Sequence, residues 1–499
     1  MPAPNLLFLY TDEQRYDTLA AYGNTRIQMP NLDRLAEQST VFERAYCTQP
    51  VCTPSRCSLL TGLWPHTSGC TRNNIPLRPE TKCLPEMLPT GRYLCAHHGK
   101  WHLGDEIFRQ HGFDEWRSTE DVYHAYYRPD RDQSKRSDFH HWLVARGHTP
   151  DPNDLPPEIG SRFFRKQIAR LPEQHSRPAF LSEQAARFIR DNSDRPWALY
   201  VNFLEPHMPF HSCRDGQYSP DDVELPANFD PERPALNVLR HRLKAARYFH
   251  NGFEGQPLKT ERHWRELIAR YWGLCSLVDT HVGRILDALR ETGRFDNTII
   301  VFTSDHGDMM GSHGLLGKTV MFEQSVRVPM LIRLPGQAEP RRVTGPVSQI
   351  DVVPTLLDLL GAGRREGLQG TSLRPQLAGG GRVDRDVFIE WIPDGEGPGQ
   401  ITGAGQGELP DYAAGIAPPE GLAASCADSI RTIVTTDGWK LNCSAAGEHE
   451  LFDLGADPLE RHNLAGDPAV RRRMAELAER IRAWQRRTDD TLDLPAIHP

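Results

Sequence analysis

The sequence predicts an α/β fold with a large, mostly parallel mixed sheet flanked by helices, followed by a smaller C-terminal α+β domain. Three apolar runs have the length and the β-branched or aromatic content of buried parallel strands: residues 5–11, 197–204 and 298–303. Helical segments separate these runs, and this alternation is typical of a parallel sheet. Each run ends in polar residues, and such sheets bind ligands at the carboxyl ends of their strands. We therefore expect a ligand site at that edge.

Three further segments have the pattern of helices. Residues 30–38 begin with a proline, whose missing N–H costs nothing in the first turn of a helix. Residues 265–292 carry apolar side chains at helical spacing and are followed by Gly293. A shorter helix is expected at residues 351–360, with Gly361 as its cap.

The remaining segments are expected to be less regular. Residues 104–178 are rich in charged residues, histidine and proline, which indicates insertions and surface helices around an access route. The Gly- and Pro-rich residues 393–424 predict a long loop. Residues 430–442 predict a hairpin, and residues 468–487 predict an amphipathic helix.

The 499 residues suffice for two domains, and we place the large α/β domain in residues 1–380 and the smaller one in residues 381–499. Lys and Arg number 58 against 66 Asp and Glu, which gives no electrostatic reason to expect nucleic acid or a membrane as a partner. No apolar run approaches the roughly 18 residues of a membrane span. The N-terminus lacks the basic region of a secretory signal, so a cytoplasmic location is expected, and the ten cysteines are expected to be free thiols.

The most specific pattern is the pentapeptide Cys-Thr-Pro-Ser-Arg at residues 52–56. Pro54 stands where a helix could begin, which would place Cys52 just before the helix and Arg56 in its first turns. The free N–H groups at a helix start and a guanidinium both favour an anion such as sulfate or phosphate. The same field would lower the pKa of the thiol. The residues therefore indicate either a nucleophile beside an anion cradle or a buried structural cysteine.

Other side chains with suitable chemistry follow predicted strands. Asp12 and Asp305 each end a core strand, and their oxygens, with the imidazole of His306, would suit a divalent cation; each could instead cap a helix or a turn. Lys100 and His102 are two residues apart, so on an extended segment both would face the same side. Their alternative is a surface lysine and a structural histidine.

The pentapeptide resembles the Cys-x-Pro-Ser-Arg motif of the type I sulfatases, which belong to the alkaline phosphatase superfamily. Further segments resemble that family in the family's order: residues 5–12, 30–36, 99–104, 206–210, 303–308 with Lys318, and 450–464. The resemblance implies an alkaline-phosphatase-like fold and oxidation of Cys52 to formylglycine (3-oxoalanine) by a formylglycine-generating enzyme. It also implies that Asn73 contacts the bound anion.

The resemblance implies one divalent metal ion, with Ca²⁺ favoured and Mn²⁺ or Mg²⁺ as alternatives. Where the family often has aspartate and asparagine, this chain has Glu13 and His306. Glu13 is therefore the least secure ligand, and a histidine ligand moves the preference towards Mn²⁺ or Zn²⁺. The expected ligands are Asp12, Glu13, Cys52, Asp305 and His306.

The implied chemistry is the attack of a hydrated formylglycine hydroxyl on the sulfur of a sulfate ester. Asp305 would orient or deprotonate that hydroxyl, His207 with Lys318 would protonate or stabilise the leaving oxygen, and His102 would take the last proton. The charge of the sulfuryl oxygens would be spread over cations. The expected catalytic residues are Cys52, Arg56, Lys100, His102, His207, Asp305 and Lys318; the expected anion contacts are Asn73, Lys100, His207 and Lys318. For His207 and Lys318, a loop histidine and a solvated lysine are the alternatives.

These residues favour hydrolysis of a small sulfate monoester, aryl or other, but leave alternatives. A phosphonate monoester or phosphodiester hydrolase of the same superfamily is favoured by His306 and by the Gly-Leu-Leu-Gly run before Lys318. Lys100 and His102 favour the sulfatase, because that other branch tends to have uncharged hydroxyl residues there. A catalytically silent relative would keep Cys52 as a thiol. The natural substrate and the oligomeric state, including a homo-oligomer, stay open.

Overall fold

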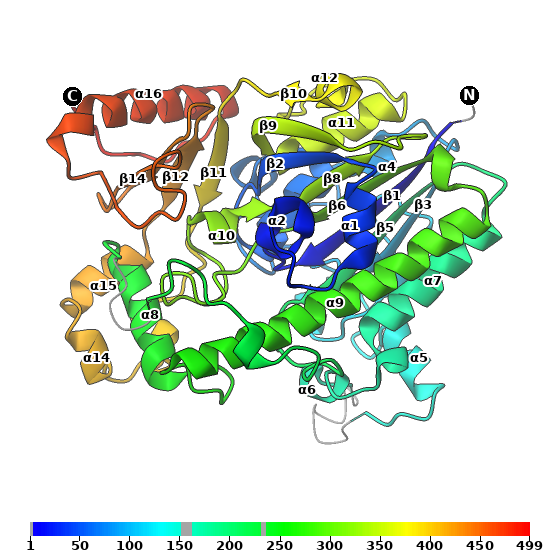
Figure 1. Ribbon diagram of the computed structural model, residues 1–499, viewed down its shortest axis with the longest axis horizontal. Helices are drawn as coiled ribbons and strands as arrows, with labels where there is room; N and C mark the ends of the chain where they lie inside the picture. Colours follow the sequence, from blue (N-terminus) through cyan, green and yellow to red (C-terminus); the bar gives the residue numbers. More distant parts are fainter. Residues whose placement is uncertain (1–2, 151–161, 231–235) are drawn as a thin grey trace.

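The computed structural model describes residues 3–150, 162–230 and 236–499, and its main feature is a ten-stranded sheet in the order β10-β9-β2-β8-β6-β1-β5-β3-β4, with β7 paired to β2. The three predicted strands form its centre, where β1 pairs in parallel with both β5 and β6. Most other pairings are also parallel, but β8 runs antiparallel to β6 and β2, and β7 to β2. The predicted α/β class is therefore confirmed (Figure 1). The strands are β1 Asn5–Asp12, β2 Thr40–Tyr46, β3 Leu94–Gly99, β4 Glu115–Ser118, β5 Trp197–Pro206, β6 Thr298–Ser304, β7 Arg327–Val328, β8 Met330–Arg333, β9 Arg341–Ser348 and β10 Gly381–Arg382.

Helices cover both faces of this sheet because its central strands are apolar on both sides. In β1, Leu7 and Leu9 face one core and Leu6 and Phe8 face the other, as alternation along a strand requires. Figure 1 shows α7 and α9 crossing one face, with α11 and α12 on the other. The helices on the first face are α1 Pro30–Ala36, α7 Arg177–Asp191 and α9 Glu261–Glu291; those on the second are α2 Cys52–Thr61, α4 Leu84–Met87, α11 Val352–Leu359 and α12 Arg374–Gly379.

The predicted helices are confirmed, with small differences at their ends. Helix α9 begins four residues before the predicted start, because the hydroxyl of Thr260 caps it by accepting from the N–H of His263. Gly361 follows α11 in the left-handed conformation (φ +70°), as expected for a terminating glycine.

A second, antiparallel sheet of four strands follows, in the order β11-β12-β13-β14. Its strands are β11 Val387–Trp391, β12 Ile430–Val434, β13 Trp439–Ser444 and β14 Glu450–Asp453, and α16 Arg471–Thr488 packs against it. The predicted hairpin and amphipathic helix are confirmed. Strand β10 at residues 381–382 still pairs with β9 of the large sheet. The domain division after residue 380 stays a prediction.

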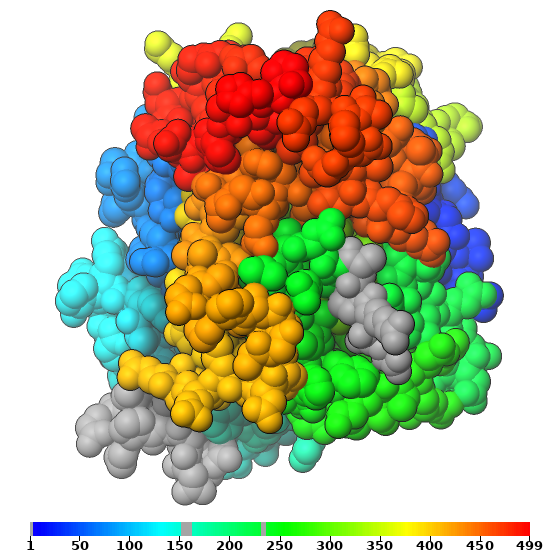
Figure 2. All heavy atoms as spheres, turned by 90° about the vertical axis from the view of Figure 1, so that its left-hand side faces the viewer, coloured from blue at the N-terminus to red at the C-terminus, as the bar shows by residue number. Residues whose placement is uncertain are grey.

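The prediction of a long loop at residues 393–424 is wrong. Three short helices lie there, and they pack against α8 Leu239–Asn251 around a small apolar cluster. Glycine and proline here mark helix ends, since Pro398 and Pro419 begin two of the helices. In Figure 2 this segment, in yellow and orange, lies beside green α8. The helices are α13 Pro398–Thr402, α14 Asp411–Ala414 and α15 Pro419–Cys426.

The charged region 104–178 contains short elements, as expected, although residues 151–161 lie outside the described part. Its helices are α5 Asp138–Val144 and α6 Arg165–Ile168; elsewhere lie α3 Pro65–Ser68 and α10 Glu323–Val326. Among the described residues, no helix combines the length and the apolar character needed to cross a membrane. All ten cysteines are free, in agreement with the sequence.

Glu450 makes one pH-dependent contribution to stability that can be isolated. Burial of this carboxyl, opposed by a hydrogen bond from Asn442 and by the charge of Lys440, raises its pKa from 4.5 to about 7. A carboxyl whose pKa rises on folding stabilises the protein below its unfolded pKa, and that stabilisation is lost as the pH rises through about 7. We therefore expect Glu450→Gln to gain about 2 to 3 kcal/mol of unfolding free energy relative to the wild type between pH 5 and pH 8. Urea denaturation of both proteins at the two pH values measures this; an unchanged difference would contradict it.

Candidate functional site

The candidate site lies at the carboxyl edge of the two central strands. Asp12 ends β1 and Asp305 follows β6, and the two strands are in register up to Thr11 and Ser304. The N–H of Asp305 donates to the carbonyl of Thr11 at 3.0 Å, which fixes the two aspartates side by side. Helix α2 points its first residue, Cys52, at this pair. The helix thus begins at Cys52 rather than just after it, with Val51 as the N-cap.

A buried guanidinium joins the two carboxylates. Nη2 of Arg56 lies 2.9 Å from Oδ2 of Asp12, and its Nε lies 3.0 Å from Oδ2 of Asp305; all three side chains have no solvent exposure. Nζ of Lys100 lies 2.5 Å from the same oxygen of Asp12. Burial alone would raise the pKa of Asp12, but Lys100, His207 and Arg56 hold it well below its ordinary value.

Four of the five expected metal ligands lie together. The ligand atoms of Asp12, Cys52, Asp305 and His306 are all within 4.8 Å of one another. Nε2 of His306 is 3.4 Å from Sγ of Cys52, which is 3.6 Å from Oδ1 of Asp12. Two carboxylates and an imidazole are a donor set that divalent ions accept, so these residues fit a metal ion.

Glu13, the fifth expected ligand, belongs to a neighbouring group with Asp12 and His207. Its backbone is in the left-handed region (φ +69°), and its two buried carboxylate oxygens accept no hydrogen bond among the described residues. They face an ammonium and an imidazole instead, with Nζ of Lys318 at 3.4 Å and Nε2 of His207 at 3.5 Å. Burial raises the pKa of Glu13 to about 7, against the opposing charge of Lys318.

The expected lowering of the Cys52 thiol pKa is wrong. Burial, reinforced by Asp12, raises this pKa to about 11, and the charges of Lys100 and Lys318 only reduce the shift. The helix start does supply a favourable field, but desolvation of a thiol with 1% exposure outweighs it. Nζ of Lys318 lies 3.1 Å from Sγ of Cys52, so this lysine also reaches the site.

Lys100 and His102 both lie at the site, but not for the reason that their spacing suggested. His102 is in the left-handed conformation (φ +59°), so the segment is not an extended strand there. Its Nε2 lies 3.0 Å from Oδ1 of Asn74, and its ring stacks on Tyr123. Burial and the charge of Lys100 hold the pKa of His102 well below its ordinary value. The imidazole is therefore neutral at physiological pH.

Asn73 lies outside α2, but its side chain reaches the start of that helix, where its Oδ1 accepts from the N–H of Thr53 at 3.1 Å. The side chain therefore holds the helix end that carries Cys52. Its expected contact with an anion stays a prediction.

Sequence reasoning missed several residues that hold the site together. Glu106 accepts the N–H groups of Trp101 and His102 at 2.8 and 2.6 Å, which fixes the turn after β3. Gln349 accepts from the hydroxyl of Ser55 at 2.8 Å and donates to the carbonyl of Ser304 at 2.5 Å. Gln349 joins α2 to the end of β6 and has no nearby motif that would reveal it; the missed residues are Asn74, Glu106, Tyr123 and Gln349.

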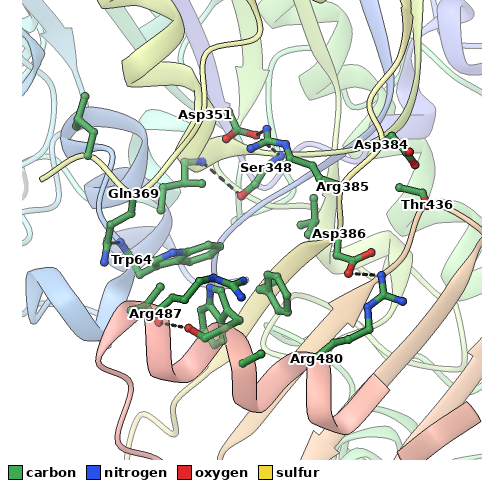
Figure 3. Close-up of a pocket in the computed structure, with 17 residues that line it drawn as sticks. Trp64, Ser348, Asp351, Gln369, Asp384, Arg385, Asp386, Thr436, Arg480 and Arg487 are labelled. Carbon is green, nitrogen blue, oxygen red and sulfur yellow. Dashed lines mark hydrogen bonds and ion pairs between the residues drawn. The ribbon is translucent and has the colours of Figure 1, made fainter. Parts of the chain in front are cut away.

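A cavity of about 680 Å³ lies away from this cluster, between α16 and the two sheets. None of the predicted site residues lines it. Its walls include two ion pairs, Arg385 with Asp351 and Arg480 with Asp386 (Figure 3). The candidate site and this cavity are therefore separate features.

Comparisons with known proteins agree with one another. The family model described as Sulfatase matches residues 4–362. The choline-sulfatase of Rhizobium meliloti is 30% identical over 93% of this chain and 83% of its own length. The multifunctional alkaline phosphatase superfamily protein PehA of Trinickia caryophylli is 27% identical over 97% of this chain and 96% of its own length. Among solved structures, the phosphonate monoester hydrolase SpPMH from Silicibacter pomeroyi superimposes with a TM-score of 0.75 at 25% identity, covering 98% of this chain and 96% of that one.

Proposed function

The chain belongs to the sulfatase family, a family of sulfuric ester hydrolases, and on this basis we propose that it hydrolyses a small sulfate monoester with formylglycine formed from Cys52 as the nucleophile. One observation carries the proposal: Sγ of Cys52, at the first residue of α2, lies among two carboxylates, an imidazole and the ammonium of Lys318. The carboxylates and the imidazole suit a divalent ion, and the ammonium suits the oxygens of a sulfuryl group bound beside residue 52.

Asp12, Asp305 and His306 would hold the ion together with the modified residue 52. One hydroxyl of the hydrated aldehyde would serve as nucleophile, and the ion, when bound, would supply positive charge to the sulfuryl oxygens. Ca²⁺ is the proposed ion, with Mn²⁺ and Mg²⁺ as alternatives.

Three cations of the chain would stabilise the sulfuryl group: Arg56, Lys100 and Lys318. Arg56 and Lys100 are buried and already held by Asp12, so their positions are fixed before substrate binds. Fixed charges in a site without water stabilise developing negative charge more than they would in solution. Burial alone would lower the pKa of Lys318, but Cys52, Glu13 and Asp12 outweigh burial and hold this pKa well above its ordinary value. The ammonium therefore keeps its proton.

Two histidines would handle protons. Nδ1 of His207 lies 2.7 Å from the carbonyl of Met208, which directs Nε2 into the site. Burial and Lys318 hold the pKa of His207 well below its ordinary value, so the protonated Lys318 supplies the positive charge at the leaving oxygen. His102 keeps a buried Nδ1 without a hydrogen-bond partner among the described residues, and this neutral nitrogen can accept a proton.

Phosphonate monoester or phosphodiester hydrolysis is the second candidate. It is supported by His306 in the ligand set, by the likeness to SpPMH and by the multifunctional relative PehA. The charged pair Lys100 and His102 supports the sulfatase. The third candidate is a catalytically silent protein that keeps Cys52 as a free thiol. A formylglycine-generating enzyme would be a partner of the two hydrolases but not of the silent protein.

A paired rate comparison tests the proposed function. On protein with formylglycine confirmed at position 52, kcat/KM is measured for 4-nitrophenyl sulfate and for the 4-nitrophenyl monoester of phenylphosphonate. We expect the sulfate to be preferred about a hundredfold, which is about 2.7 kcal/mol of transition-state discrimination. The opposite preference would establish the phosphonate hydrolase instead.

Metal removal gives a second prediction. We expect a chelator to lower both kcat and Tm, and Ca²⁺ restored at about one hundred times its Kd to raise the unfolding free energy by about 2.7 kcal/mol. Asp305→Asn should lose most of this response. Asp279→Asn is the matched control, because Asp279 is a buried acid that caps α1 away from the site. Equal Tm values with chelator, Ca²⁺, Mn²⁺ and Mg²⁺ would contradict the proposed ligand set.

A further inference from the structure

Helix α8 places two buried cations next to the loop that carries Lys318. Arg240 is 3% exposed and Lys244 is 8% exposed. Nη1 of Arg240 donates to the carbonyl of Thr319 at 2.8 Å, and Nη2 donates to its hydroxyl at 3.3 Å. Nζ of Lys244 donates to the same hydroxyl. Thr319 directly follows Lys318, so both cations are attached to the backbone beside the proposed catalytic ammonium.

Helix α8 contacts this loop through side chains on one of its faces. Arg240, Lys244 and Tyr248 are spaced four residues apart, which places them on one face of the helix. The hydroxyl of Tyr248 donates to the carbonyl of Leu316 at 3.0 Å. Trp391 lies against the guanidinium of Arg240, with 4.6 Å between Cζ and the ring centre. One face of α8 therefore presents two fixed cations to the segment from Leu316 to Thr319.

Neither cation has a carboxylate within 4.0 Å in the described ranges 3–150, 162–230 and 236–499. Buried lysine and arginine are normally paired, because an unpaired buried charge costs several kcal/mol. The same chain follows that rule elsewhere: buried Lys100 lies 2.5 Å from Asp12, and buried Lys440 lies 2.8 Å from Glu460. Lys244 differs from these two buried lysines, because no carboxylate of the described residues lies within ion-pair distance of it.

The groups that surround these two cations do not neutralise them. Burial and the charge of Arg240 lower the pKa of Lys244 to about 7, while Asp394 and Glu396 act only from beyond ion-pair distance. An anion bound beside Lys244 would favour its protonated, cationic form. Burial, together with the charges of Arg240 and Lys244, holds the pKa of His241 well below its ordinary value. Donors remain free for a ligand, since the buried Nε of Arg240 has no acceptor among the described residues and Lys244 donates to a single oxygen there.

We propose that Arg240 and Lys244 form a second anion subsite, and that the natural substrate carries a second oxyanion, a sulfate or a carboxylate, besides the sulfate that is cleaved. This assignment rests on the proposed sulfatase function, because Lys318 links the two subsites. A substrate of this kind would supply the counter-charge that α8 lacks.

The test compares substrates that differ only in the second oxyanion. The probes are phenyl sulfate and the 1,2-, 1,3- and 1,4-disulfates of benzene, which offer three spacings between the two anions. We expect at least one disulfate to exceed phenyl sulfate by tenfold or more in kcat/KM, chiefly through a lower KM. Arg240→Gln and Lys244→Gln should each reduce this ratio to within about twofold of unity. Arg242→Gln, which removes a cation from the same helix, should leave the ratio unchanged.

Binding without turnover separates failure of the subsite from failure of the proposed function. Calorimetric titration of benzenedisulfonates and of benzenesulfonate into the wild type and the two α8 variants reports the subsite even if no sulfate ester is cleaved. Tighter binding of a disulfonate that is lost in both variants supports the subsite. It is overturned if the disulfonates bind no better than benzenesulfonate, or if both folded variants, checked by circular dichroism, keep the wild-type preference.

Discussion

Cys52→Ala is expected to lower kcat for sulfate release by at least about a thousandfold, because it removes the proposed nucleophile while leaving the surrounding charges in place. The side chain is buried and small, so the fold should tolerate alanine. Cys57→Ala is the matched control, since Cys57 lies in the same helix, is equally buried and contacts Thr61 rather than the site. It should keep activity within a few fold.

Peptide mass of the wild type at position 52 completes this experiment. Formylglycine in the active protein and loss of activity in Cys52→Ala would together support the proposed chemistry. Activity that survives the substitution would show that another group attacks the ester. A thiol in protein purified from its own host, with no activity to lose, would favour the silent protein.

Arg56→Met is expected to cause the largest loss of stability of any substitution at the site. The guanidinium bridges two carboxylates that have no solvent exposure. Its removal deprives Asp305 of its guanidinium partner and leaves Asp12 with Lys100 at 2.5 Å and Lys318 at 3.9 Å. Removing one partner of a buried charge cluster typically costs about 3 to 5 kcal/mol. Urea denaturation in the presence of a chelator measures this cost without a contribution from the metal.

Two further variants make the Arg56 result interpretable. Arg187→Met breaks an exposed pair with Asp191 and should cost less than about 0.5 kcal/mol. Adding Asp305→Asn to Arg56→Met should recover part of the loss, because it removes one stranded charge. If Arg56→Met costs no more than Arg187→Met, the bridge is not what stabilises this edge of the sheet.

The parts of the fold that the sequence predicted are those governed by local patterns. Strands β1, β5 and β6 are buried on both faces and therefore read as continuous apolar runs, and α9 has a long apolar stripe. Asp12 and Asp305 were predictable because they end such runs. The short helices of residues 398–426 were not, since the same glycines and prolines that delimit them also occur in loops.

The rest of the site depends on contacts between distant segments. Gln349 bonds to residues 45 and 294 positions away, and no periodicity reports such contacts. The sequence placed Lys100 and His102 on the same side of an extended segment. Both do lie at the site, but His102 is in a left-handed conformation and its N–H donates to Glu106, so strand spacing is not the cause. The prediction of a lowered pKa for the Cys52 thiol was wrong because burial, which depends on the whole fold, outweighs the local field of the helix start.

The burial of Cys52 sets an order of events during synthesis. A modifying enzyme cannot reach a side chain that is 1% exposed, so the proposed conversion to formylglycine would have to precede folding of this edge. That edge is complete only after β6, which ends at Ser304. About 250 residues separate it from Cys52, and at about 5 to 20 residues per second the ribosome needs roughly 13 to 50 seconds to add them. Under the proposed chemistry, a chain that folds before oxidation would keep its thiol. Slower synthesis should therefore raise the fraction of chains with formylglycine at position 52.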